Sequence, residues 1–208
     1  MYYVRFYYWI TMTLPRTKPV ALTANQGLHK IQEFLHSKHG MKFLHHQLDI
    51  ETVYNSLDRK RRPFFTAVEK LILPNTVILF DVTGKPNIRH AICMLCSPNA
   101  VEIFDPNGTS GGEGADIPTW IDKLSHIVEE LCSLSCLPTY AYDFNVNPNS
   151  VCDNWVHWFL YQRIHIGLSQ LKISALLDHY DRLDKDELTA VACEITDFVK
   201  IWPRCPRR

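Results

Sequence analysis

The sequence predicts an α+β domain in which helices pack on a central mixed β-sheet. Short apolar runs separated by turn signals fill the middle of the 208-residue chain, and amphipathic helical segments lie on both sides of them. A hydrophobic content of 46% and a charged content of 21% are typical of a globular protein and exclude a disordered chain. We expect one domain over residues 1–208, with its core at about 74–165.

The aromatic N-terminal segment, MYYVRFYYWITMTLP, has one arginine and no small-residue cleavage site, so it is a poor signal peptide. We expect a first strand that pairs with the rest of the domain. The alternative is that residues 1–22 form an extension, either disordered or docking a partner. No run approaches eighteen apolar residues, which predicts no transmembrane helix and no membrane partner.

The next segment, Thr23–His39, predicts a helix that Thr23 caps and Gly40 ends. Its apolar residues recur on one helical face: Leu28, Ile31, Phe34 and Leu35. A short helical turn is expected at 52–57. The basic run DRKRRP, residues 58–63, predicts a solvated loop, with a contact to phosphate or to an acidic partner as the alternative.

The central apolar runs predict three consecutive strands at 76–82, 89–96 and 100–104, joined by the turn signals TGKPN and SPN. We expect these strands to form a meander at the centre of the sheet. A glycine-rich loop at 105–116 and an amphipathic helix at 117–131 follow. An alternating segment then predicts a fourth strand at 140–146.

Two helices are expected in the last third of the chain. The first starts at Cys152 and is buried, because it carries apolar residues such as Trp155, Trp158, Phe159 and Ile166. The second spans 183–200, where Asp184 followed by Glu187 three residues later forms a capping-box pattern.

Charge and cysteine content narrow the function classes. Lys+Arg and Asp+Glu each number 22, so the formal net charge is zero and the basic footprint of a duplex-binding protein is absent. Seven scattered cysteines do not resemble a dense disulfide framework, which predicts free thiols in a reducing compartment. The spacing of Cys93, Cys96, Cys132 and Cys136 is poor for zinc, and we expect no metal and no cofactor.

Three residues carry reactive side chains that the predicted strands and helix do not need in order to form. His90 begins a buried strand, Asp105 ends the next strand, and Cys152 lies in the first turn of a helix. A hairpin of the two strands brings His90 and Asp105 to the same edge of the sheet, where the carboxylate can orient the imidazole. A helix N-terminus stabilises a thiolate and offers backbone donors to an oxyanion. We therefore expect Cys152 as nucleophile, His90 as base and Asp105 as orienting acid.

The segments HAICMLCSPNAVEIFDPNG and NPNSVCDNWVHWFLYQRI resemble the adenovirus-protease (adenain)/SUMO-protease superfamily of cysteine peptidases. The triad order His, acid, Cys and the surrounding elements match over about residues 74–165. The resemblance implies an adenain-like cysteine protease fold and catalysis by His90, Asp105 and Cys152. In size the chain is most like viral maturation proteases.

The chain departs from this superfamily at two positions. The glutamine that usually precedes the cysteine, and helps to bind the oxyanion, is missing. Asn147 is the first candidate to replace this glutamine because of its Pro-Asn context. Asn145 is the second candidate because of its spacing from Cys152. The glycine that usually follows the nucleophile is replaced by Asp153, whose carboxylate opposes a thiolate.

The resemblance implies a thiol endopeptidase that cleaves viral structural or precursor proteins, including capsid proteins, in the virion or in the host cytoplasm or nucleus. It also allows a nucleic-acid or peptide activator. The alternatives are a catalytically silent relative with a structural or binding role in a virion, and a deconjugase of ubiquitin-like modifiers.

Overall fold

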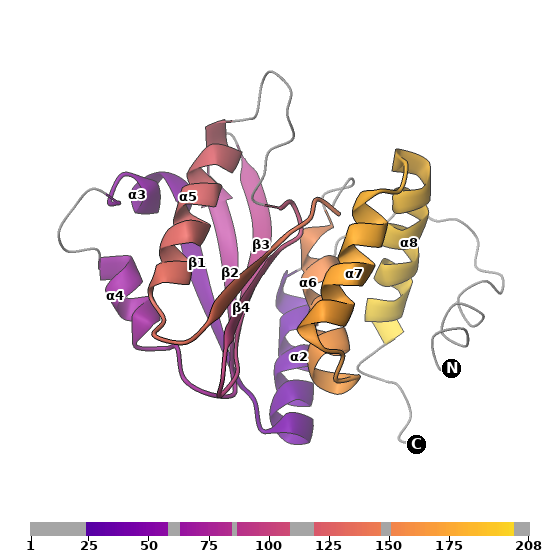
Figure 1. The fold of residues 1–208 in the computed structure, drawn as a ribbon, viewed down its shortest axis with the longest axis horizontal. Coiled ribbons are helices and arrows are strands. Elements are labelled where there is room, and N and C mark those ends of the chain that lie inside the picture. The colour runs from indigo at the N-terminus through magenta and orange to yellow at the C-terminus, as the bar shows by residue number, and fades with distance from the viewer. Residues whose placement is uncertain (1–23, 58–62, 85–86, 109–118, 147–150, 202–208) are drawn as a thin grey trace.

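The computed structural model describes residues 24–57, 63–84, 87–108, 119–146 and 151–201. Three consecutive strands occupy the middle of these segments, and four consecutive helical elements follow the last strand (Figure 1). Their order is α2 (Ala24–His39), β1 (Lys42–Asp49), α3 (Ile50–Tyr54), α4 (Pro63–Glu69), β2 (Thr76–Gly84), β3 (Ile88–Cys96), β4 (Val101–Asp105), α5 (Thr119–Ser133), β5 (Thr139–Asp143), α6 (Cys152–Leu160), the π-helix η1 (Tyr161–His165), α7 (Gln170–Asp181) and α8 (Lys185–Ile201).

The five strands form one sheet in the order β1-β2-β3-β4-β5. The central strands β2, β3 and β4 pair antiparallel, whereas β1 pairs parallel with β2 and β5 pairs parallel with β4. The sheet is therefore mixed, and the predicted α+β class is confirmed. The predicted meander is confirmed as well, and it occupies the three inner positions.

Helices cover both faces of the sheet, so the chain has two hydrophobic cores. Helices α2, α6, α7 and α8 lie on one face and α3, α4 and α5 on the other (Figure 1). Alternate residues of β2 serve the two cores: Val77 and Leu79 face α6, while Ile78 and Phe80 face α5. This explains why the central strands are apolar at nearly every position instead of alternating.

The structure adds three elements to those predicted. Strand β1 has the sequence KFLHHQLD and lies at the sheet edge, where only Leu48 is fully buried, so its apolar signal is weak. Helix α4 is a short segment of seven residues. Helix α7 follows Ser169, whose side chain accepts the backbone amide of Lys172 as a cap.

The remaining boundaries differ from the predictions by a few residues. The fourth strand, expected at 140–146, is β5 and ends at Asp143. The predicted capping box of the last helix is confirmed: Glu187 N–H donates to Asp184, and Asp184 N–H donates to the Glu187 carboxylate. The predicted N-terminal strand within residues 1–22 and most of the basic run lie outside the described residues.

Within the described part of the chain, no helix is long and apolar enough to cross a membrane. Of the described cysteines, 93, 96, 132, 136 and 152 are free thiols, as the sequence predicts.

Candidate active site

His90 lies near the start of β3, beyond the point where this strand stops pairing with β4. The β3–β4 register runs from Cys96 and Val101 to Cys93 and Phe104. On its other side β3 still pairs with β2, since His90 lies opposite Val82. The imidazole is 4% exposed, so its polar atoms need partners within the protein.

Asp105 provides the first of these partners. The His90 Nε2 atom lies 2.7 Å from Asp105 Oδ1, and both side chains are buried. This contact confirms that the predicted hairpin brings His90 and Asp105 together. Because Nε2 donates to the carboxylate, Nδ1 is the ring nitrogen that remains for a thiol.

The Asp105-Pro106-Asn107-Gly108 turn holds the carboxylate in place. The backbone N–H of Asn107 donates to Asp105 Oδ1 at 2.8 Å, and Gly108 N–H donates to the Asp105 carbonyl. Gly108 has φ +71°, and a Cβ there would lie 3.2 Å from the Phe144 carbonyl carbon. Glycine is therefore required both for the backbone conformation and for the close approach.

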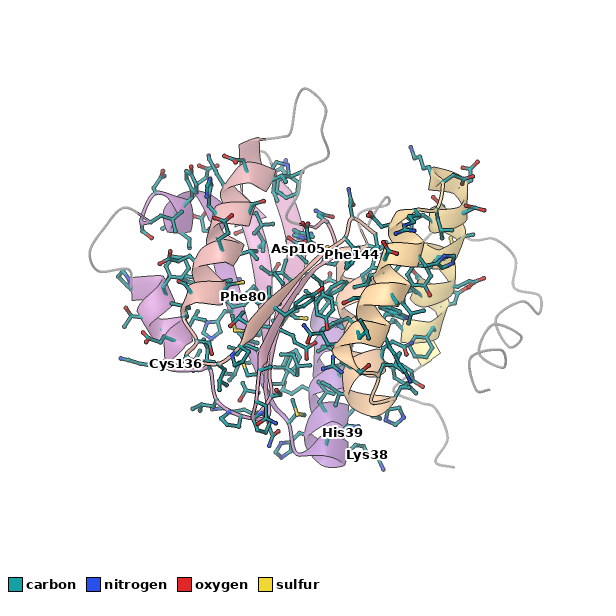
Figure 2. All side chains as sticks on the ribbon, viewed as in Figure 1. Lys38, His39, Phe80, Asp105, Cys136 and Phe144 are labelled. Carbon is teal, nitrogen blue, oxygen red and sulfur yellow. The ribbon has the colours of Figure 1, made fainter. Side chains whose placement is uncertain are left out.

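The same turn contacts the chain that leads toward Cys152. Val146 N–H donates to the Pro106 carbonyl at 2.9 Å. Figure 2 shows Asp105 and Phe144 next to each other at this end of the sheet. The turn after β4 and the segment after β5 thus support each other beside the candidate site.

Cys152 is the first residue of α6 and is 6% exposed. Its side chain forms a hydrogen bond with His90, so the imidazole lies between the Asp105 carboxylate and the Cys152 thiol. The preceding Val151 makes no side-chain cap hydrogen bond to the helix. The N-cap residue itself therefore supplies no side-chain acceptor to the first amides of α6.

The electrostatics of this arrangement favour a charged imidazole. Burial acts to lower the pKa of His90, but the charge and hydrogen bond of Asp105, together with Cys152, outweigh it and raise that pKa to about 10. At neutral pH His90 is then an imidazolium, which is the state that stabilises an adjacent thiolate.

Asp153, the residue after Cys152, introduces a second carboxyl group that interacts with His90. Burial, followed by repulsion from Asp81, raises the pKa of Asp153 to about 6, although His90 and His45 act in the opposite direction. Asp81 also lies 4.0 Å from His45, across the β1–β2 pair. The Asp153 carboxyl is therefore about half ionised near pH 6 and mostly ionised at neutral pH.

Trp120 and Asp81 are neighbours of the site that sequence reasoning missed. The Trp120 ring, in the first turn of α5, is tilted against the His90 ring with centroids 6.2 Å apart. The amphipathic pattern of α5 identifies Trp120 only as one of the apolar residues of the helix. Asp81 interrupts the apolar run of β2, and this interruption is the signal that could have singled it out.

The two predicted oxyanion residues have different outcomes. Asn147 lies outside the described residues. Asn145 is exposed in the segment after β5, and its backbone N–H donates to Asp181 of α7 at 3.1 Å. The structure therefore ties the Asn145 backbone to α7, and an oxyanion role for its side chain stays a prediction.

Among the described residues, no group of three or more His, Cys, Asp or Glu side chains could hold a metal ion. Cys93 and Cys96 face opposite cores, as their spacing on a strand requires. Burial raises the pKa of Cys93 well above the ordinary thiol value and that of Cys96 to about 11. Neither is a candidate nucleophile.

Comparison with known proteins yields structural neighbours only. No protein-family model and no curated protein matches the sequence. The fold is similar to the crystal structure of ASFV pS273R protease, with a TM-score of 0.48 and 14% identity over 88% of this chain and 69% of that chain. The selenomethionine structure of that protease gives a TM-score of 0.41 and 15% identity over 88% and 70% of the two chains. The central domain of the Legionella pneumophila protein Lpg1148 gives 0.35 and 13% identity over 86% and 99%.

Proposed function

We propose that this chain is a cysteine endopeptidase in which Cys152 is the nucleophile, His90 the general base and acid, and Asp105 the residue that orients His90. The observation that carries the proposal is the buried imidazole held between a carboxylate and a thiol. The two ring nitrogens of a buried histidine can be satisfied by any suitable pair of hydrogen-bond partners. Two opposite partners, one of them a thiol at a helix start, are the arrangement of a nucleophile with its oriented base.

The chemistry follows from these positions. The Cys152 thiolate attacks the carbonyl carbon of a peptide bond and forms a C–S bond. His90 gives its proton to the leaving amine, the C–N bond breaks, and a thioester remains. His90 then takes a proton from water, which attacks the thioester; the C–S bond breaks, the carboxylic acid is released, and the Cys152 thiolate and the His90 imidazolium are restored.

The oxyanion of both steps needs donors next to Cys152. The first-turn amides of α6 support this role, because Val151 cannot cap them with its side chain. Asn147 is our proposed side-chain donor, on its sequence context alone.

The substrates we propose are polypeptides. The resemblance of the His–Asp and Cys segments to viral maturation proteases supports structural or precursor proteins of a virus as the physiological targets. It also supports a peptide or nucleic-acid activator, and action in the virion or in the host cytoplasm or nucleus.

One observation favours a second candidate, a catalytically silent relative that binds without cleaving. Asp153 places a carboxyl group beside the nucleophile, and above pH 6 its charge opposes the thiolate. In such a relative the triad would persist without turnover.

Limiting alkylation tests the reactive Cys152 thiol that both candidates share. Brief iodoacetamide treatment at pH 6, followed by peptide mapping, should label Cys152 before the exposed Cys136. Accessibility alone favours Cys136, so preference for the buried thiol reports a thiolate. Preferential labelling of Cys136, Cys93 or Cys193 would remove Cys152 from this role.

Turnover is tested separately with a library of quenched fluorescent peptides. Cleavage should disappear in Cys152→Ala and persist in Cys132→Ala, which removes a half-buried thiol on α5. A wild-type protein that alkylates at Cys152 but cleaves no peptide supports the silent relative.

A further inference from the structure

A buried ion pair joins the strand that carries Asp105 to the helix that carries Cys152. Glu102 of β4 is 3% exposed, and Arg163 of η1 binds it through two guanidinium nitrogens. The Nε–Oε2 distance is 2.8 Å. Such a two-point contact fixes the angle between the two groups as well as their separation.

Neighbouring groups complete the hydrogen bonding of this pair. Tyr142 of β5 donates its hydroxyl to Glu102 Oε2. Arg163 Nη1 donates to the carbonyl of Leu168, in the turn between η1 and α7. The charged groups therefore connect β4, β5 and the end of the nucleophile helix.

Each member of the ion pair lies on the same stretch of chain as one residue of the candidate site. Glu102 lies three residues before Asp105, about 10 Å along the strand. Arg163 lies eleven residues after Cys152, about 16 Å along the helix. The arginine side chain leans toward the N-terminus of its helix, which shortens the second span.

A stacked aromatic contact lies between these two ends. The rings of Phe104 and Phe159 are 4.7 Å apart at their centroids and 13° from parallel. Cys152, Phe159 and Arg163 are spaced by seven and four residues, so they share one face of the helix. On β4 the alternate residues Glu102 and Phe104 point toward this face of the helix, and Asp105 is the next residue along the strand.

A contribution to the stability of the fold does not by itself explain why the Glu102–Arg163 ion pair lies here. Buried ion pairs often contribute no more stability than apolar residues of similar volume, because desolvation offsets their attraction. Apolar packing such as the Phe104–Phe159 stack permits sliding, whereas a two-point ion pair permits one register.

We propose that Glu102 and Arg163 are positioning residues: their ion pair sets the position of α6 along β4 and thereby holds Cys152 against His90. This inference rests on the proposed function, in which Cys152 must reach the imidazole. Neither residue contacts the reacting atoms.

The test measures the contact between Cys152 and His90 directly. The pKa of His90 is followed by NMR of its imidazole in the full chain, first in the wild type and in Cys152→Ala. The difference between these two values is the contribution of the thiol. Arg163→Lys, which keeps the charge but loses the planar fork, should lose most of that contribution, and alkylation of Cys152 at pH 6 should slow by at least about tenfold.

A second variant covers the case in which an unpaired buried charge prevents folding. Glu102→Gln with Arg163→Met leaves Tyr142 an acceptor and replaces the arginine stem with a side chain of similar length. This double variant should also lose the contribution of the Cys152 thiol to the pKa of His90. Val128→Ala, in the core on the opposite face, is the control for lowered stability and should retain it.

The outcomes separate this inference from the proposed function. If Arg163→Lys and the double variant retain the wild-type thiol contribution, the positioning role is overturned. If Val128→Ala loses it as strongly, the effect is one of general stability and the positioning role is again overturned. If the contribution is lost as expected but wild type cleaves no peptide, positioning holds and the peptidase proposal fails.

Discussion

The Oδ1 atom of Asp105 accepts two hydrogen bonds, one from the Nε2–H of His90 and one from the backbone amide of Asn107 in the turn that follows Asp105. The carboxylate is thus oriented by its own main chain before it orients the histidine. The aspartate that forms this turn is therefore also the residue that we propose orients the histidine.

Asp105→Asn tests the charge without removing the hydrogen-bond acceptor. The amide oxygen can still accept from Asn107, so we expect the fold to persist. Without the carboxylate, burial dominates and the pKa of His90 falls. Peptide turnover should drop by roughly 10²–10⁴-fold. Steady-state kinetics measures the drop, with Asp178→Asn on the surface of α7 as the control. Unchanged turnover would exclude Asp105 from the mechanism.

The raised pKa of His90 predicts a pH dependence of stability. The folded-state value of about 10 exceeds the ordinary value of 6.5, so between these values the folded state holds a proton that the unfolded chain releases. The unfolding free energy contributed by this group is fully present below pH 6.5 and is lost as the pH rises toward 10. Urea unfolding across this range should show a steeper decline in wild type than in His90→Gln. Parallel declines would contradict the charged pair.

Asp153→Asn should make the nucleophile more acidic. The Asp153 carboxyl, with a pKa of about 6, becomes negative over the range in which a thiolate must form. Removing this charge should lower the midpoint of the pH profile for Cys152 alkylation by about one unit. The rate of Cys152 alkylation at a series of pH values from 4 to 9 gives this midpoint, and Asp122→Asn, at an exposed position on α5, is the control. A midpoint that stays in place or rises would show that Asp153 does not oppose the thiolate.

Gly108→Ala should disturb both stability and site geometry. Gly108 combines a positive φ with close contacts to the chain after β5, whereas Gly40 has a positive φ of 62° and nothing within 4 Å of an added Cβ. Gly40→Ala therefore reports backbone strain alone, about 1–2 kcal/mol. Urea unfolding should show a greater loss for Gly108→Ala, and only this variant should slow Cys152 alkylation. Equal losses would mean that the close contact is unimportant.

Asn147→Ala should lower turnover by roughly 10²–10³-fold if Asn147 is an oxyanion donor. Alkylation of Cys152 should hardly change, because that reaction develops no oxyanion. Asn145→Ala should have little effect, since the backbone of Asn145 is held by Asp181 of α7. Kinetics of both variants decides between them. A larger effect of Asn145→Ala would mean that Asn145, which the spacing from Cys152 suggests, is the oxyanion donor in place of Asn147.

The meander and its contact between His90 and Asp105 could be predicted because they are local. Apolar runs with short turns determine the pairing of β2, β3 and β4, and this pairing brings the histidine to the aspartate. The capping box of α8 was predictable for the same reason, since its two hydrogen bonds join residues three apart.

The parts that could not be predicted depend on distant segments. The edge strand β1 has a weak apolar pattern, and its pairing with β2 is visible only in three dimensions. The proximity of Asp81 to Asp153 joins β2 to α6, and the Glu102–Arg163 pair joins β4 to η1. No spacing rule along the chain identifies such partners.

The arrangement of parallel and antiparallel strands has a consequence for the order of folding. The β2–β3 and β3–β4 pairs close short loops, whereas the first β1–β2 and β4–β5 partners are 34 (76 minus 42) and 38 (139 minus 101) residues apart. Contacts between distant residues form more slowly, because the intervening chain loses more entropy when its ends meet. We expect the hairpins that contain His90 and Asp105 to form first and α6 to dock last. The nascent protein would then assemble its acid–base pair while the thiol is still elsewhere, and reactivity at Cys152 would report completion of the native structure.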